Sequence, residues 1–341
     1  MAAMASSTSR RRLPELDLRT FRRLTLLGVI MLALIVVTGG AVRLTGSGLG
    51  CPTWPQCGDG SFVPHSAYSI NGAIEFGNRL VSVVIGVVML ATPLAALRLR
   101  EPRRDLVLLS FGLWGGFLAQ VVLGGITVLV KLHPATVAAH FLVSMVLLFN
   151  AVVLHRRARQ APGRTTPAVR MELLWLARLL VVVAAAALAI GTVVTGSGPH
   201  SGDSEEVVRF GFDIVTVAQL HADVAMVLTG LTLAMVFVVR LAGAPAEARR
   251  SANALLLAVV AQGAIGFAQY FTGVPEVLVA LHMAGATIMW IITVQLWLAM
   301  AERPPAPASA WSSARPAAPE PEPSTTGTPG TDIPRKPITV G

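Results

Sequence analysis

Three histidines lie inside long apolar stretches of the sequence. They are His140, His221 and His282, and each lies about four to seven residues from the same end of its apolar run. Ionisable side chains in such segments are costly, usually face the interior of a helix bundle and usually carry function. Histidines at matched depth on facing helices therefore predict a shared functional site.

Three kinds of chemistry could use these histidines. Each could simply hydrogen-bond a neighbouring helix, or they could form a proton relay. Relays usually recruit several acids, whereas the apolar runs offer only Glu75 near this depth, with Glu276 at a helix entrance. Heme iron takes axial imidazoles from opposite faces, so His221 and His282 could sandwich one porphyrin. Matched depth favours heme ligation, in which each of His140, His221 and His282 would bind a heme iron.

The first half of the chain differs from the second at one position. Asn78 lies near the place that corresponds to His221, and asparagine is a poor iron ligand. A heme held by His140 alone would keep one face open to O2 or water, which suits oxygen chemistry. Glu75 shares a helical face with Asn78 and could move protons or stabilise a polar intermediate. The alternative for Glu75 is an acid favoured near a helix start by the helix dipole.

Two cysteines, Cys51 and Cys57, follow the first apolar run. Their predicted location is the outer side of a membrane, where oxidising conditions favour a disulfide. Both a structural staple and a redox relay remain open, and the residues alone favour the staple. His65 and His133 lie in nearby loops and are rival ligands.

The elements that must position these residues are transmembrane helices. The chain has 341 residues, of which 54% are hydrophobic and 13% charged, against about a quarter charged in soluble domains. Backbone groups in lipid must pair within their own segment, so long apolar runs must be helical. We expect eight spans, at Leu24–Leu44, Ile74–Leu97, Leu106–Val130, Ala135–Leu154, Leu173–Val194, Ile214–Val239, Ala254–Phe271 and Val277–Ala299.

Charge distribution predicts the orientation of the spans. If the amino terminus is cytoplasmic, 23 of the 27 Lys and Arg residues lie on the cytoplasmic side. This asymmetry satisfies the positive-inside rule and places both termini in the cytoplasm. The net charge of +9 is spread between the spans, so we expect no nucleic-acid partner. A composition rich in alanine and arginine is typical of a high-GC bacterium, so we expect the membrane to be a bacterial plasma membrane.

An internal repeat predicts the fold class, an all-α membrane protein made of two tandem four-helix bundles. Val137-Ala138-Ala139-His140 recurs 142 residues later as Val279-Ala280-Leu281-His282, and Thr45-Gly46-Ser47-Gly48 recurs at 195–198. The expected organisation is a basic tail (1–23), a first bundle with the substrate site and cysteine loop (24–154), a linker (155–172), a second bundle (173–299) and a disordered tail (300–341).

The segment from Thr38 to Cys57, TGGAVRLTGSGLGCPTWPQC, resembles the first helix end and outer loop of bacterial heme A synthases. Glu75-Phe76-Gly77-Asn78-Arg79 matches the place where that family carries a glutamate and, in many members, a histidine three residues on. The resemblance covers about residues 22–298. It implies oxidation of the C8 methyl group of heme O to the formyl group of heme A, for terminal cytochrome oxidase assembly.

The resemblance also implies residue roles and partners. His221 and His282 would bind a heme b cofactor, while His140, Glu75 and Asn78 would face the heme O substrate, with Glu75 catalytic. Asn78 departs from the two-histidine pattern of the family. In members with paired cysteines the pair is implicated in function, which brings staple and relay close to parity. Implied partners are the lipid bilayer, heme O synthase upstream and an electron donor of unidentified kind, with a homo-oligomer left open.

Two rival functions remain open at this point. One is a diheme electron carrier resembling cytochrome b561, and the other is a heme-delivery or assembly factor. A carrier should hold both hemes with paired histidines, which the single span histidine of the first bundle disfavours. An assembly factor has no use for a permanently bound second heme.

Overall fold

The computed structural model describes residues 15–58, 60–64, 70–200, 202–203 and 208–303. Within these residues the chain forms eight long helices and one pair of two-residue strands. The helices are α1 (Leu18–Leu44), α2 (Ile70–Ala96), α3 (Arg104–Leu129), α4 (Pro134–Ala158), α5 (Met171–Ser197), α6 (Ile214–Leu241), α7 (Ala246–Phe271) and α8 (Glu276–Ala299).

Each of these eight helices is long and apolar enough to cross a membrane. The prediction of an all-helical membrane protein with eight spans is therefore confirmed. The helices are longer than most of the predicted runs because they continue into the polar ends. α1 begins at Leu18 rather than Leu24, and α4 continues through His155 to Ala158. Apolarity delimits the part of a helix that lipid can cover, whereas hydrogen bonding continues beyond it.

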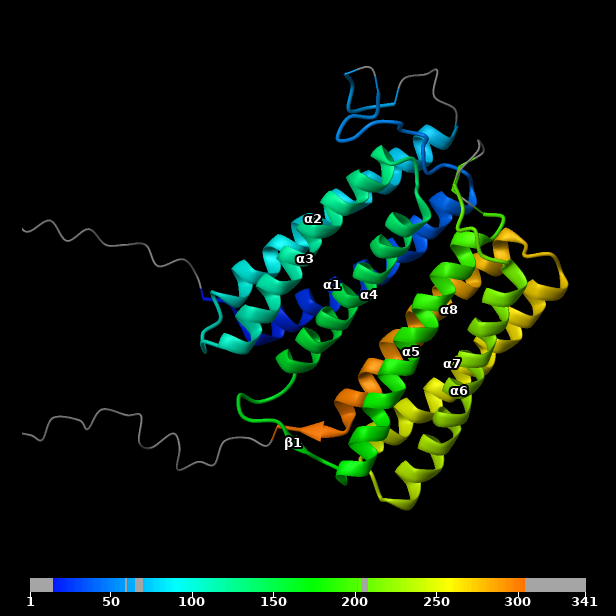
Figure 1. Ribbon diagram of the computed structural model, residues 1–341. Coiled ribbons are helices and arrows are strands. Elements are labelled where there is room, and N and C mark those ends of the chain that lie inside the picture. The colour runs from blue at the N-terminus through cyan, green and yellow to red at the C-terminus, as the bar shows by residue number, and fades with distance from the viewer. Residues whose placement is uncertain (1–14, 59, 65–69, 201, 204–207, 304–341) are drawn as a thin grey trace, which may run out of the picture. The chain divides into compact units, whose positions relative to one another are not determined.

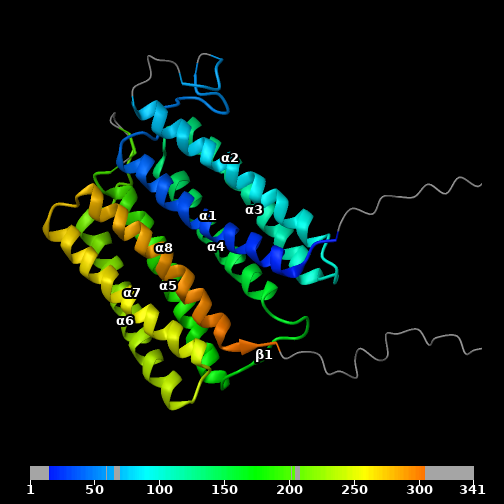
Figure 2. The same ribbon diagram turned by 180° about the vertical axis from the view of Figure 1, so that it is seen from behind.

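The helices pack as two rings of four. α1 contacts α2 and α4, and α3 contacts α2 and α4, while α5 to α8 make the corresponding contacts among themselves. Both views in Figures 1 and 2 show α1–α4 on one side and α5–α8 on the other. We call the side that carries the Cys51–Cys57 loop the loop side, and the side where α1 begins the tail side. The tandem repeat and the cytoplasmic position of the termini stay predictions.

The two rings meet through α1, α4, α5 and α8. On α8, the Trp290 indole N–H donates to the carbonyl of Met145 on α4 at 2.9 Å. Phe149 of α4 stacks against Trp297 of α8, with ring centroids 5.6 Å apart. Gly40 of α1 lets Met283 of α8 approach so closely that an added Cβ would lie 2.6 Å from its methyl carbon. Aromatic packing and small residues thus hold the rings together where lipid cannot enter.

An arginine network joins the helices on the tail side. Arg103, only 5% exposed, pairs with Asp105 and donates to the carbonyls of Arg157 and Gln160 at the end of α4. Arg303 also pairs with Asp105, at 2.7 Å. These contacts tie the start of α3 to the end of α4 and to the segment that follows α8.

A short strand pair lies outside the eight predicted spans. β1 (Thr166–Pro167) lies in the predicted linker, and β2 (Ala301–Glu302) lies in the tail predicted to be disordered from residue 300. The two strands pair antiparallel, so the chain remains ordered through Arg303. Backbone pairing and the Arg303–Asp105 contact hold this segment, which composition alone does not reveal. Residues 304–341 and 1–14 of the predicted tails lie outside the described residues.

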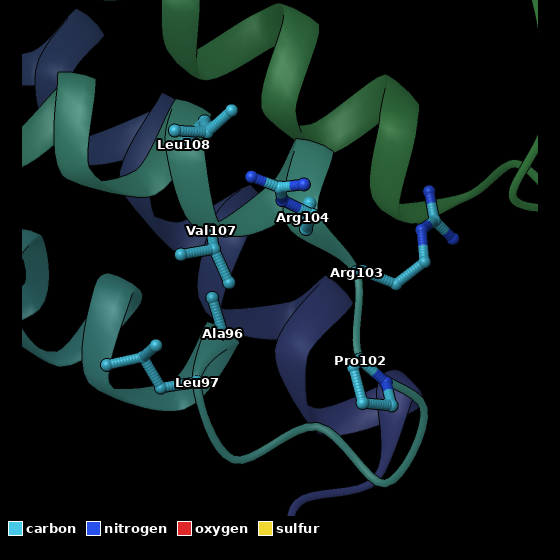
Figure 3. A pocket seen from close by; sticks show the side chains of 7 residues that line it. All are labelled: Ala96, Leu97, Pro102, Arg103, Arg104, Val107 and Leu108. Carbon is cyan, nitrogen blue, oxygen red and sulfur yellow. The ribbon is translucent and has the colours of Figure 1, made fainter.

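An apolar pocket lies on the tail side, between the end of α2 and the start of α3. Figure 3 shows it lined by Ala96, Leu97, Pro102, Val107 and Leu108, with the Arg103 side chain extending toward the end of α4. The three span histidines lie near the opposite helix ends, so this pocket is not their site.

We expect Arg103→Gln to destabilise the protein, because it removes a buried cation that holds two helix ends and the carboxylate of Asp105. Loss of hydrogen bonds to a charged group costs about 1.5–3 kcal/mol. The midpoint of thermal unfolding in detergent should fall. Arg104→Gln is the matched control, since Arg104 is exposed on the same turn. Equal midpoints for the two variants would contradict the network.

Candidate functional site

Each span histidine packs against a glycine of the preceding helix. An added Cβ at Gly124 of α3 would lie 3.1 Å from Cε1 of His140 on α4, and one at Gly191 of α5 would lie 3.1 Å from Cε1 of His221 on α6. At Gly266 of α7 the corresponding distance to Cε1 of His282 is 3.7 Å. A missing side chain thus makes room for each imidazole between two helices.

The three imidazoles lie at a similar depth and in similarly buried surroundings. His140 and His282 each follow the start of their helix by six residues, and His221 follows its helix start by seven. A helix rises 1.5 Å per residue, so all three lie roughly 10 Å from the loop-side helix ends. Their Nδ1 atoms are buried without a hydrogen-bond partner among the described residues, and the Ala187 carbonyl lies near the ring of His221.

His221 and His282 face one another. Their ring centroids are 6.3 Å apart and their planes make an angle of 71°. An imidazole nitrogen binds a metal at about 2.0–2.1 Å, and the ring centroid lies about 1 Å farther along, so two rings on opposite faces of one ion have centroids about 6 Å apart. The observed separation fits axial ligation of one iron.

This pair fits a heme better than a bare metal ion. Among the described residues, no group of three or more His, Cys, Asp and Glu side chains gathers to hold a metal. A protein that binds a heme supplies only axial ligands, because porphyrin nitrogens supply the others. His221 and His282 could supply two such ligands, and Nδ1 of each ring is buried without a hydrogen-bond partner among the described residues.

His140 has polar neighbours but no facing histidine. Gln120 of α3 donates through Nε2 to the backbone carbonyl of His140 at 2.9 Å and to the hydroxyl of Ser144. Ser144 also donates to the His140 carbonyl, at 2.9 Å. These bonds fix the backbone beneath the imidazole, whose Nδ1 has no hydrogen-bond partner among the described residues.

Asn78 of α2 is held by the first helix. Its Oδ1 accepts a hydrogen bond from the Thr38 hydroxyl of α1 at 2.9 Å. No hydrogen bond or ion pair joins Asn78 or Glu75 to His140 within the described residues. Within the described residues, a histidine ring lies beside His282, and no ring contact joins another histidine to His140.

Glu75 forms an ion pair rather than acting only as an acid near a helix start. Its Oε1 accepts from Arg79, one turn later on α2, through Nε at 3.1 Å and Nη2 at 2.6 Å. Its Oε2 accepts from the backbone N–H of Cys51 at 2.6 Å. The carboxylate is 6% exposed. It therefore links α2 directly to the cysteine loop.

Cys51 and Cys57 form the predicted disulfide, with the Cα atoms 4.3 Å apart and both residues fully buried. Trp54, at the centre of the loop, packs against α3, where an added Cβ at Gly125 would lie 2.6 Å from the indole. The loop is therefore seated on both α2 and α3. Its redox role, staple or relay, stays a prediction.

The rival loop histidines have other contacts. His133 caps α4, its Nδ1 accepting the N–H of Ala135 at 3.4 Å. His200 pairs through Nε2 with the carbonyl of Val274 at 2.8 Å. His65 lies outside the described residues. Neither His133 nor His200 is placed with the span histidines.

Sequence reasoning missed three groups of residues around the site. Arg79 was counted only among outer charges, although its spacing of four from Glu75 is a signal for a helix ion pair. The sequence alone assigns no role to Gln120 or to the three glycines Gly124, Gly191 and Gly266. A glycine on one helix that packs against a histidine on the next helix leaves no periodic pattern in the sequence of either helix.

Comparison with known proteins identifies the family. A family model described as "Cytochrome oxidase assembly protein" matches residues 22–294. The chain is 29% identical over 147 residues to a heme A synthase of Exiguobacterium sibiricum, covering 42% of this chain and 49% of that protein. It is 33% identical over 123 residues to a heme A synthase of Bacillus cereus, covering 36% and 39%.

The chain thus aligns with less than half the length of these curated relatives. The family model, in contrast, covers all eight helices, from within α1 to within α8. The chain therefore belongs to the cytochrome oxidase assembly protein family, and its predicted membership of the heme A synthase family is confirmed.

Proposed function

We propose that this chain is a heme A synthase, a membrane oxidoreductase that oxidises the C8 methyl group of heme O to a formyl group by successive hydroxylations. The observation that carries the proposal is the asymmetry between the two rings. His221 and His282 form a facing pair, whereas His140 has only Asn78 near the corresponding position. Two rings with different numbers of ligands suit one resident cofactor and one substrate.

In this proposal the second ring holds heme b, which supplies one-electron transfer when bound. His221 and His282 would hold it through their imidazoles, for which Gly191 and Gly266 give room. The Ala187 carbonyl near His221 can orient that ring, as second-shell acceptors commonly do for ligating histidines. The paired ligands leave no open face, so this ring is not proposed to bind oxygen.

The first ring takes the substrate. His140 would bind the heme O iron, with its backbone held by Gln120 and Ser144. Asn78, tied to Thr38, leaves the other face without an imidazole. Glu75, at the loop-side end of α2, would hold or move a proton at its carboxylate during oxidation. The Cys51–Cys57 loop closes this end of the ring against solvent.

The proposed setting is the bacterial plasma membrane, with the loop side outward and the termini cytoplasmic. The eight apolar helices and the cation-rich tail side support this orientation. Heme O synthase would supply the substrate, and an electron carrier would exchange electrons with heme b. The two-ring arrangement supports the proposed tandem repeat of bundles.

The electron-carrier alternative predicts paired ligands in both rings, which Asn78 disfavours. The assembly-factor alternative agrees with the description of the family as cytochrome oxidase assembly proteins, but a delivery protein has no need of the facing pair. Neither alternative requires Glu75 for chemistry, so this residue distinguishes them from the enzyme.

Glu75→Gln is expected to abolish heme A formation in cells that make heme O and carry this gene as their source of heme A. General acid–base groups typically contribute about 10²–10⁴-fold to rate. Extraction and chromatography of cellular hemes should show heme O or its hydroxylated product accumulating, while purified protein keeps heme b. Glu276→Gln, an acid at the loop-side start of α8, is the matched control. Heme A at wild-type level in the Glu75 variant would contradict the assignment of Glu75 as the group that holds or moves a proton in the oxidation.

Gly191→Ala should disturb heme b while Gly266→Ala should not. The new methyl group would lie 3.1 Å from the His221 ring in the first case and at an ordinary 3.7 Å from His282 in the second. Both changes favour the helix by about 1 kcal/mol, so helix propensity cannot separate them. The optical spectrum and the heme-to-protein ratio should show high-spin or missing heme b only for Gly191→Ala. Identical spectra would contradict this placement of His221.

A further inference from the structure

Arg79 makes more contacts than an ion pair needs. Besides Glu75, its guanidinium donates to three backbone carbonyls of the disulfide loop. Nη2 reaches those of Cys51 at 3.2 Å and Thr53 at 3.1 Å, and Nη1 reaches that of Gln56 at 3.2 Å. These carbonyls belong to the first residue, the middle and the last residue before Cys57, so one side chain spans the loop.

Glu75 closes the same network from the other direction. One carboxylate oxygen accepts from Arg79, and the other accepts the N–H of Cys51. Cys51 therefore donates its N–H to Glu75 while its carbonyl accepts from Arg79. The position of the carboxylate and the position of the disulfide are set by the same pair of side chains.

A simple helix ion pair does not explain this arrangement. A glutamate followed four residues later by an arginine stabilises a helix without any partner outside it. Here the side chains of Arg79 and Glu75 are only 23% and 7% exposed, and the loop carbonyls would otherwise have to be satisfied by water. The planar guanidinium spreads five donors over three nitrogens and can bond a carboxylate and several carbonyls, whereas the lysine ammonium has only three donors on one atom.

We propose that Arg79 is a positioning residue that holds the Cys51–Cys57 loop and the Glu75 carboxylate in one fixed arrangement at the mouth of the first ring. The inference rests on the proposed function, because it assigns Arg79 to the site where Glu75 acts. Its direct consequence concerns the disulfide. Both cysteines are fully buried, so a reductant reaches them only when the loop opens, and Arg79 opposes that opening.

The test compares Arg79→Lys and Arg79→Gln in the full-length protein carrying heme b. Arg209→Gln is the matched control, because Arg209 is another loop-side arginine that donates to a backbone carbonyl, that of Pro199. The probe is a water-soluble phosphine. It gives two electrons to the disulfide, the S–S bond breaks, and water supplies the oxygen of the resulting phosphine oxide and the protons of the two thiols. Alkylation followed by mass spectrometry measures the rate.

We expect both Arg79 variants to be reduced faster than wild type by about tenfold or more, the factor for losing one or more hydrogen bonds to a charged group. Arg209→Gln should be reduced at the wild-type rate. The heme b spectrum should be unchanged in all three. In heme A formation, kcat should fall for Arg79→Lys with little change in KM, because substrate binding is left intact while Glu75 is displaced.

Wild-type reduction rates in both Arg79 variants would overturn the proposal. So would loss of heme b together with the faster reduction, because Arg79 would then support the whole fold rather than this site. Arg79→Lys guards against a folding defect in Arg79→Gln, since it keeps the charge beside Glu75. Failure of the proposed function is distinguishable: wild-type protein would then make no heme A, while the dependence of disulfide reduction on Arg79 would persist.

Discussion

Close contact between neighbouring helices is the constraint on which this structure depends. Lipid offers no hydrogen bonds, so a polar ring in a span must be enclosed by protein. Each span histidine meets this requirement at a glycine of the preceding helix, where the absent side chain leaves room for the imidazole. The same contact sets the depth of the imidazoles and brings His221 and His282 to face one another.

The two rings of helices differ in the polar residues that accompany this histidine–glycine contact. In the second ring, two imidazoles that each pack against a glycine face one another and could act as paired ligands. In the first ring, Asn78 bonds to Thr38 instead, and a polar cluster of Glu75 and Arg79 lies nearer the loop-side end. A disulfide loop anchored on α2 by this cluster and on α3 by Trp54 covers that end. Under the proposed function, this asymmetry would separate the binding of a permanent cofactor from the turnover of a substrate.

Much of this could be predicted from the sequence. Apolar runs located eight helices because lipid leaves no other way to pair the backbone, and matched depth singled out His140, His221 and His282. The disulfide followed from two cysteines on the side predicted to be oxidising. The helix ends at Leu18 and Ala158 could not be predicted from apolarity, since polar turns continue the hydrogen bonding beyond the lipid-covered part.

Other features depend on contacts between distant segments. The β1–β2 pairing joins residues 166–167 to 301–302, and a tail rich in proline and alanine gives no sign of it. Arg79 looks like one of four outer cations until the loop folds back over α2. The contacts between glycines and span histidines likewise can be recognised only when two helices are placed side by side.

The most direct test of the account is the heme spectrum of two matched variants, His221→Ala and His140→Ala. Both remove a span histidine that packs against a glycine at the same depth, so their effects on packing are comparable. The account predicts that purified His140→Ala keeps a low-spin heme b, whereas His221→Ala loses it or becomes high-spin. A full low-spin heme b spectrum in His221→Ala would contradict the assignment of the second ring as the cofactor site.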